Sequence, residues 1–348
     1  MAGSQPLVSV VMPAWNAGAT IVEALRSVAA QTYRNLEIII VDDGSADATA
    51  ALASQFCASD ARARIVNRSN GGPAAARNLG IAEARGEWIA LIDADDVWHP
   101  SKVEKQVTVA LAADERPGFV YCWYRKIDAG GFVTGSGPRW AAEGRAFLPL
   151  AYLHFIRGGS SLLLSKAAFI EAGGYDESFR QGCEDVVLEL DIARRRPIAV
   201  VPEYLFGYRA HAANFTRDFD LLLAGWTRAS ATIHGRARLP GNLVRHANAQ
   251  RSVAIAVQRA VERKPGPFIR AAVTALALDP VRSSLSLLGT AVNVGARRLR
   301  KRAVAGQRRR FSEVGTTERL RVGSEPRVWF STLVDRLDGR RMRKFAEF

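Results

Sequence analysis

The segment Leu91-Ile92-Asp93-Ala94-Asp95-Asp96 joins an apolar run to three carboxylates within four positions. Trp88 to Ile92 has the composition of a buried strand, and a parallel sheet would place these carboxylates at its carboxyl end, where open α/β sheets bind their ligands. Crowded carboxylates repel one another and lose hydration, so a bound cation would compensate for both costs. The alternative is a polar turn that ends the strand and caps a helix starting near Pro100-Ser101.

The residues around this segment alternate between strand-like and helix-like patterns. The predicted strands are Leu7 to Met12, Leu36 to Val41, Arg64 to Asn67 and Trp88 to Ile92. The predicted helices are Gly18 to Gln31, Ala46 to Cys57, Ala74 to Ala84 and Ser101 to Ala113. Unbroken apolar strands that alternate with amphipathic helices are typical of a parallel sheet covered on both faces. We therefore predict an α/β, Rossmann-like, mostly parallel sheet flanked by helices.

The second half of the chain continues this pattern and then changes character. Further strands are predicted at Gly118 to Lys126, Ser160 to Leu164 and Val200 to Tyr208, with a loop from Asp128 to Ala146 and helices from Lys166 and from Glu184 to Arg196. From about Phe219 the segments are helical and rich in Ala, Leu and Arg. We place the domain boundary near Asp218, with halves of about 6–116 and 117–218 before it and a helical, basic region at 219–348.

The composition and the apolar segments indicate the cellular location of the protein. The three cysteines are few and far apart, which fits neither a disulfide framework nor a zinc site and indicates a reducing compartment. The start of the chain lacks the basic segment and long apolar stretch of a signal peptide. The best candidate for a membrane span, Ala271 to Ala296, is interrupted by Asp279, Pro280 and Arg282. We expect a cytoplasmic protein, in contact at most with the inner face of the cell membrane.

The positive charge is concentrated in the tail. The chain carries a net charge of +14, and residues 291–348 contain 16 Lys and Arg against 6 Asp and Glu, a net charge of +10, which leaves +4 for the rest. Arg297 to Arg310 and the segment from Trp329 to Arg341 combine cations with apolar side chains, a pattern typical of binding to an anionic membrane surface. The alternative is a solvated basic tail. No nucleic-acid-binding module accompanies the charge, so no nucleic-acid partner is expected.

Acidic pairs recur at the ends of the predicted elements. Asp42-Asp43 follows one strand, and Glu184-Asp185 opens a helix. Asp also favours turns and helix N-termini for local reasons, so each pair alone has a structural explanation. If the sheet is parallel, Asp42-Asp43 and the carboxylates from Asp93 to Asp96 lie at the same edge. That edge would suit a phosphate ligand that carries Mg²⁺ or Mn²⁺.

Five segments match a known family in order and spacing: Val8 to Asn16, Ile40 to Ser45, Gly71 to Asn78, Asp93 to Asp96, and Glu184-Asp185. They resemble the family 2 glycosyltransferases of the GT-A fold, and the resemblance covers about residues 6–216. It implies transfer of a sugar from a nucleotide sugar. The tail after Asp218 has no such match.

The resemblance implies a nucleotide site made of Pro13, Trp15, Asn16, Asp42, Asp43, Arg77 and Asp93. Trp15 would flank the base, its alternative being an ordinary partly buried tryptophan. The pair Asp42-Asp43 would contact the uracil edge, with Asp43 the preferred contact. Arg77 would lie near the nucleotide, its alternative being a surface arginine without a partner.

The resemblance also implies the metal and catalytic residues. Asp95 would bind Mg²⁺ or Mn²⁺ directly, and Asp93 would bind the ribose or complete the metal shell. His211, in the segment Tyr208 to Thr216 that resembles the family's closing loop, would complete the shell or stabilise the leaving group. Asp185 would be the catalytic base, because an acceptor hydroxyl is a poor nucleophile until its proton is removed, and Glu184 would orient the acceptor. Asp96 is left as a possible helix cap.

Two features depart from the family. Val186-Val187 follows the acidic pair where members often carry aromatic residues, so the acceptor pocket is open to question. Gln307 to Phe311 resembles the Gln-x-x-Arg-Trp motif of processive synthases only superficially, and we expect transfer of one sugar per encounter.

The predicted activity is that of a metal-dependent, inverting glycosyltransferase of hexosyltransferase type. The donor would be a UDP-sugar or another nucleotide sugar, and the acceptor a hydroxyl of a glycan or lipid-linked molecule in cell-surface polysaccharide or glycolipid synthesis. Two alternatives are a nucleotidyltransferase of related fold and a non-catalytic protein that binds nucleotide sugars or serves as a membrane scaffold.

Overall fold

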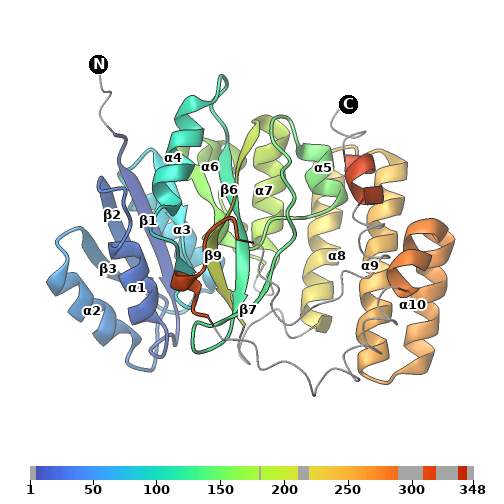
Figure 1. The fold of residues 1–348 in the computed structure, drawn as a ribbon, viewed down its shortest axis with the longest axis horizontal. Coiled ribbons are helices and arrows are strands. Elements are labelled where there is room, and N and C mark those ends of the chain that lie inside the picture. Colours follow the sequence, from blue (N-terminus) through green and yellow to red (C-terminus); the bar gives the residue numbers. More distant parts are fainter. Residues whose placement is uncertain (1–4, 180–181, 211–218, 289–308, 319–335, 343–348) are drawn as a thin grey trace. The chain divides into compact units, whose positions relative to one another are not determined.

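The computed structural model describes residues 5–179, 182–210, 219–288, 309–318 and 336–342 (Figure 1). The chain divides into two compact units. Unit 1 comprises Met1–Ala146, Phe155–Ile233 and Arg308–Glu318, and unit 2 comprises Phe147–His154, His234–Gln307 and Arg319–Phe348. The predicted boundary near Asp218 falls on residues outside the described ranges, and the two units meet along the chain inside helix α8 (Phe219–Arg236).

Unit 1 is built on one sheet. Its strands are β1 (Val8–Ala14), β2 (Leu36–Asp42), β3 (Ala63–Asn67), β4 (Trp88–Leu91), β5 (Val97–Trp98), β6 (Phe119–Ile127), β7 (Val133–Ser136), β8 (Leu163–Ser165) and β9 (Ile198–Arg209). They lie in the order β3-β2-β1-β4-β8-β6-β9-β5, and β7 pairs with β6. The first four strands in this order are parallel, and β6 is parallel to β9. The prediction of an α/β fold with a mostly parallel sheet is confirmed.

Helices flank this sheet (Figure 1). In unit 1 they are α1 (Ile21–Ala29), α2 (Thr49–Ser59), α3 (Pro73–Ala82), α4 (Lys102–Ala112), α6 (Lys166–Ala172) and α7 (Glu184–Arg195). Helix α3 packs on β1 and β2, whereas α4 packs on β6 and β9. Gly80 permits the close approach of α3, because a Cβ atom there would lie 2.4 Å from Val11 Cγ1 and 3.0 Å from Val41 Cγ2. The whole of β2 is buried as a result, which explains its unbroken apolar sequence.

Three antiparallel strands were not predicted as such. β8 runs antiparallel to both β4 and β6, and its predicted start at Ser160 is instead a short 3₁₀ turn, η1 (Gly159–Ser161). β7 lies within Asp128 to Ala146, which we predicted to be a loop. β5 is a two-residue strand paired with β9. Apolar content predicts the burial of a strand but not its direction, and strands as short as β5 leave no periodic pattern.

Residues 309–318 of the basic tail belong to the sheet unit. The Val133 amide donates to the Arg309 carbonyl at 2.9 Å, and the Tyr204 amide donates to the Thr316 carbonyl at 2.9 Å. Arg125, which is completely buried, donates through Nη2 to the carbonyls of Gly315 and Glu318, both at 2.8 Å. This segment of the tail is therefore hydrogen-bonded to the strands of unit 1. Arg297 to Arg308 lie outside the described residues.

Unit 2 is helical. Its elements are α5 (Phe147–Tyr152), α9 (Gly241–Val261), α10 (Pro265–Leu278), and the helical stretches 280–288 and 336–342. The small side chains Ala271 and Ala275 of α10 are buried, and α10 packs along α9. Among the described residues of the chain, no helix is both long and apolar enough to cross a membrane.

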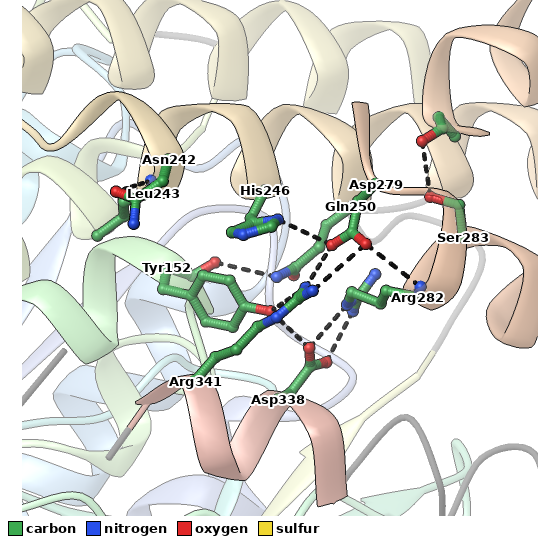
Figure 2. Close-up of polar contacts among 11 residues, drawn as sticks. Tyr152, Asn242, Leu243, His246, Gln250, Asp279, Arg282, Ser283, Asp338 and Arg341 are labelled. Carbon is green, nitrogen blue, oxygen red and sulfur yellow. Dashed lines mark hydrogen bonds and ion pairs between the residues drawn. The ribbon is translucent and has the colours of Figure 1, made fainter. Parts of the chain in front are cut away.

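A buried ion pair joins the end of the chain to the rest of unit 2 (Figure 2). Asp338 accepts two hydrogen bonds from the guanidinium of Arg282, at 2.7 and 2.8 Å, and both side chains are almost completely buried. The Tyr152 hydroxyl donates to the same carboxylate at 2.7 Å, and burial raises the pKa of Tyr152 to about 12. Three segments far apart in the sequence thus share one carboxylate.

A second buried carboxylate, Asp279, lies beside the first (Figure 2). It pairs with Arg341 and lies 2.8 Å from His246 Nδ1. Burial acts to raise the pKa of Asp279, but hydrogen bonds from Arg341 outweigh it, so the pKa is lowered. Arg341, one of the cations of the tail segment predicted to meet a membrane, thus pairs with a carboxylate of unit 2, and membrane contact of the tail stays a prediction. Trp329 and Phe330 lie outside the described residues.

We expect the substitution Asp338→Asn to lower the free energy of unfolding of unit 2 by about 3–5 kcal/mol, because the Arg282 guanidinium then stays buried without its counter-charge. The measurement is denaturant titration of the full chain, with amide hydrogen exchange in α9 and α10 to locate the loss.

The matched control is Arg340→Gln, which changes an exposed side chain on the same helical stretch and should leave exchange in α9 unchanged. An Asp338→Asn protein as stable as the wild type would show that this ion pair does not hold unit 2 together.

Candidate active site

The carboxyl ends of β1, β2 and β4 form the edge at which the predicted acidic residues meet. Ala14 pairs with Asp42 at the ends of β1 and β2, and the Asp43 amide donates to the Ala14 carbonyl at 2.8 Å. On the other side of β1, the Ile92 amide donates to the Val11 carbonyl at 3.2 Å, so Asp93 follows directly beyond the same edge. The parallel strands thus place the two acidic segments at the same edge of the sheet, on either side of the end of β1, as their positions after two strands predicted.

Asp43 holds the glycine loop that precedes α3. Its Oδ1 accepts from the Gly71 amide at 3.0 Å, and its Oδ2 accepts from the Gly72 amide at 2.8 Å. Arg68 Nε lies 3.2 Å from Oδ1, and the whole carboxylate is buried. Gly72 has φ +88°, a left-handed conformation that suits glycine. Asp43 therefore has a clear structural task.

The two carboxylate oxygens of Asp42 differ in their hydrogen bonding. Its Oδ2 accepts from the Ser45 amide at 3.2 Å. Its Oδ1 is buried and has no hydrogen-bond partner among the described residues. An unsatisfied buried oxygen costs free energy unless a ligand donates to it, so this atom marks a place for a donor group.

The loop after β1 presents an aromatic ring beside this edge. Pro13 lies opposite Val41 in the sheet register. Asn16 has φ +48°, and its side-chain oxygen accepts from the Ala46 amide at 2.9 Å, so the loop is tied to the residues after β2. Trp15, between them, is 58% exposed, and the alternative of a partly buried tryptophan is wrong. The exposed ring of this tryptophan offers a flat surface on which a nucleotide base can stack.

Arg77 joins two parts of the site. Its Nη2 lies 2.7 Å from Asp93 Oδ1, and its Nη1 lies 2.7 Å from Glu184 Oε1. The guanidinium is 5.5 Å from the centre of the Tyr175 ring, and Arg77 is only 7% exposed. The alternative of an unpartnered surface arginine is therefore wrong. Arg77 brings the end of β4 and the start of α7 into one site.

Glu184 and Asp185 differ in their surroundings. Glu184 is buried, and its Oε2 has no partner among the described residues. Burial raises the pKa of Glu184, although Arg77 acts to lower it. Asp185 is partly exposed, and its Oδ1 accepts from the neighbouring Val186 amide at 2.8 Å. Glu184 is bound to Arg77, whereas the partly exposed Asp185 is accessible to a ligand.

Asp96 does not cap a helix. Helix α4 begins at Lys102 after Ser101, and no side chain caps its N-terminus. Instead, Asp96 is buried and its Oδ1 accepts from the Arg209 amide at 2.9 Å, which joins the turn after β4 to the end of β9. Burial and the neighbouring carboxylates raise the pKa of Asp96 well above its usual range.

Arg209 is a residue of the site that we did not predict individually. Its Nε donates to the Asp95 carbonyl at 2.7 Å, and its Nη2 lies 2.6 Å from Glu23 Oε2. It is 1% exposed, so it fixes the backbone that carries Asp95. Ser160, also not predicted, accepts from the Asp93 amide through its Oγ at 3.0 Å. Neither residue stands out in sequence, because a contact across more than 60 positions leaves no local pattern.

The described residues include no group of three or more His, Cys, Asp or Glu side chains placed to hold a metal ion. Mg²⁺ commonly binds through one or two carboxylates together with substrate phosphates and waters. Asp95, which is partly exposed next to Asp93, fits that kind of site. His211 lies outside the described residues.

The chain belongs to glycosyltransferase family 2. The sequence model of "Glycosyl transferase family 2" matches residues 9–171. An uncharacterized glycosyltransferase of Rickettsia typhi is 31% identical over 233 residues, which cover 64% of this chain and 72% of that protein. A second one, of Rickettsia prowazekii, is 32% identical over 214 residues, which cover 61% of this chain and 66% of that protein. The match to family 2 that the sequence motifs predicted is confirmed.

Solved structures share the fold. TarS of S. aureus (residues 1–349), solved with UDP-GlcNAc, has a TM-score of 0.58 at 16% identity, and the match covers 90% of this chain and 99% of that one. The mannosyltransferase PcManGT of Pyrobaculum calidifontis, solved with GDP-Man and Mn²⁺, has a TM-score of 0.60 at 21% identity and covers 86% and 82%. Unit 1 thus has the GT-A fold of these glycosyltransferases.

Proposed function

We propose that this glycosyltransferase moves a single sugar from a UDP-sugar to a hydroxyl of a glycan or lipid-linked acceptor, with inversion at the anomeric carbon and with a bound Mg²⁺ or Mn²⁺. The observation that carries the proposal is the position of Arg77 between Asp93 and Glu184. Because one guanidinium binds both, the acidic strand end and the acidic start of α7 belong to one site. A sugar-transfer reaction needs groups that stabilise the leaving diphosphate and a base that deprotonates the acceptor hydroxyl.

The nucleotide is assigned to the edge formed by β1 and β2. Trp15 would stack on the base, and Asn16 and Pro13 would shape the loop that carries it. The unpartnered Oδ1 of Asp42 is suited to accept the N–H of a uracil ring. Asp43 already accepts two backbone amides, which favours Asp42 over Asp43 for this contact. The structural neighbour TarS was solved with a uridine nucleotide sugar, which agrees with a UDP donor, whereas PcManGT was solved with GDP-Man.

The diphosphate is assigned to the turn after β4. Asp95 and the free side of Asp93 would hold the cation, which when bound neutralises the diphosphate so that it can leave as an anion. Arg209 and Asp96 keep this turn in place through the Asp95 carbonyl and the Arg209 amide. The mannosyltransferase PcManGT was solved with Mn²⁺, which supports a divalent cation here.

Asp185 is assigned as the base. It would take the proton of the acceptor hydroxyl while that oxygen forms a bond to the anomeric carbon and the bond from this carbon to the diphosphate oxygen breaks. Attack from the face opposite the leaving group inverts the configuration. Glu184 is less suited, because it is buried and ion-paired with Arg77, whereas Asp185 is partly exposed. The task of Glu184 would be to fix the start of α7 and to orient the acceptor.

Family membership favours glycosyl transfer over nucleotidyl transfer and over a silent binding protein. Glu184 and Asp185 would have no evident task in nucleotidyl transfer. A role in polysaccharide or glycolipid synthesis, and contact of the tail with an anionic membrane, stay predictions. Residues 291–308 and 319–335 of the tail lie outside the described residues.

We expect the purified protein to release UDP from at least one UDP-sugar in the presence of Mn²⁺, and to lose this activity at least tenfold when the cation is removed with EDTA, because the diphosphate then leaves without charge compensation. The measurement is a panel of nucleotide sugars with detection of the free nucleoside diphosphate. Activity restored by added Mn²⁺ or Mg²⁺ is the control. Release of pyrophosphate from a nucleoside triphosphate, with no UDP release from any sugar, would contradict the proposal.

We expect Asp185→Asn to reduce transfer by a factor of about 10²–10⁴, the range for loss of a general base, while UDP affinity stays unchanged. Transfer rates and calorimetric UDP titration are the two measurements. Asp114→Asn, a change at an exposed aspartate beyond the end of α4, is the matched control and should transfer normally. Normal turnover in Asp185→Asn would rule out this assignment of the base.

A further inference from the structure

Arg157 lies in a segment that is attached to the site but has no task in the proposed reaction. It precedes η1, whose Ser160 accepts from the Asp93 amide. Gly159, which directly precedes Ser160, packs against the end of β4. A Cβ atom on Gly159 would lie 3.4 Å from Leu91 Cβ. The backbone that carries Arg157 is therefore fixed at the same edge of the sheet as Asp93.

Two tyrosine rings hold the Arg157 guanidinium. Its central carbon lies 5.7 Å from the centre of the Tyr124 ring and 5.2 Å from that of the Tyr208 ring. The rings meet edge to face at 6.2 Å. The Tyr124 ring is itself confined, because a Cβ atom on Gly137 would lie only 2.2 Å from Tyr124 Cε1. This support orients the cation without neutralising it.

Asp185 is the carboxylate whose charge contributes to the pKa of Arg157. Burial lowers the pKa of Arg157, but Tyr124, Tyr208 and Asp185 raise it, and the net shift is upward. No carboxylate of the described residues lies within ion-pair distance of Arg157. Elsewhere in this site the buried cations Arg77 and Arg209 each bind a carboxylate directly. Arg157 is thus a partly buried cation without a carboxylate partner among the described residues, and the charge of the proposed base contributes to its upward pKa shift.

From this arrangement we infer that Arg157 binds an anionic group, a phosphate or a carboxylate, that the acceptor carries near the hydroxyl that receives the sugar. The inference rests on the proposed function, because it takes the surroundings of Asp185 to be the acceptor side. A planar guanidinium held between rings presents its N–H groups in a fixed geometry that suits paired oxygen atoms. Arg157 is then a residue that determines which acceptors are bound.

Arg139 provides a matched control. Its guanidinium also lies over two aromatic rings of β6 and β9, at 5.4 Å from Trp123 and 5.2 Å from Tyr204. It donates to the Tyr204 hydroxyl at 3.0 Å and to the Thr317 carbonyl at 3.4 Å, so its polar partners lie on β9 and in the segment 309–318. Arg139→Gln removes the same kind of stacking without touching the inferred anion site.

The experiment titrates inorganic phosphate by calorimetry into the full chain saturated with UDP and Mg²⁺, so that the site for the donor diphosphate is already filled. We expect the wild type and Arg139→Gln to bind phosphate with similar affinity, Arg157→Gln to bind at least tenfold more weakly, and Arg157→Lys to fall between them. Equal phosphate binding by the wild type and Arg157→Gln, or no binding by the wild type, would overturn the inference.

A parallel UDP titration shows whether Arg157 binds an anionic group of the acceptor or the diphosphate of the donor. It also distinguishes a failure of the proposed UDP-sugar donor from a failure of the inference about Arg157. Unchanged UDP affinity in Arg157→Gln supports an acceptor group, whereas a tenfold loss of UDP affinity would show that Arg157 binds the donor diphosphate and would overturn the acceptor assignment. If the wild type does not bind UDP, the proposed donor fails. The phosphate titration of the free protein then still decides whether Arg157 binds an anion.

Discussion

The ion pairs of Arg77 are the interaction on which the site depends. A buried guanidinium is costly to desolvate, and here two carboxylates, Asp93 and Glu184, compensate for it at 2.7 Å each. Those carboxylates come from the end of β4 and the start of α7, which are 91 positions apart in sequence. Removing either carboxylate would leave the buried Arg77 with half of its charge compensation, so this interaction favours keeping the two segments together. The geometry that we propose for the reaction depends on that constraint.

The remaining acidic residues divide into those that hold the site and those that face a ligand. Asp43 binds the amides of Gly71 and Gly72, and Asp96 binds the Arg209 amide. Both are buried, and both fix loops at the edge of the sheet. Asp95 and Asp185 are partly exposed. Buried carboxylates that hold loops in place are poorly accessible to a ligand, so we assign the reaction to the more exposed carboxylates.

Much of this could be predicted from sequence, and the failures have physical causes. Strands β1, β2 and β4 are buried on both faces, so their apolar runs and their acidic ends were visible directly. The partners of Arg77 and Asp96 were not, because side-chain contacts between distant segments leave no periodic signal. The partners of the basic tail could not be predicted for the same reason. Its composition suits a membrane surface, yet Arg341 is balanced by Asp279, a carboxylate about 60 positions away that composition cannot reveal.

The most direct test of this account is a double-mutant cycle on unfolding free energy, made with Arg77→Met, Glu184→Gln and the combined variant, and measured by denaturant titration of the full chain. If Arg77 joins the two halves of the site, Arg77→Met leaves Glu184 buried without its cation, and Glu184→Gln leaves Arg77 with one of its two carboxylates. The combined loss should then be smaller than the sum of the single losses by about 1–3 kcal/mol. Strictly additive losses would contradict the claim that this ion pair holds the site together.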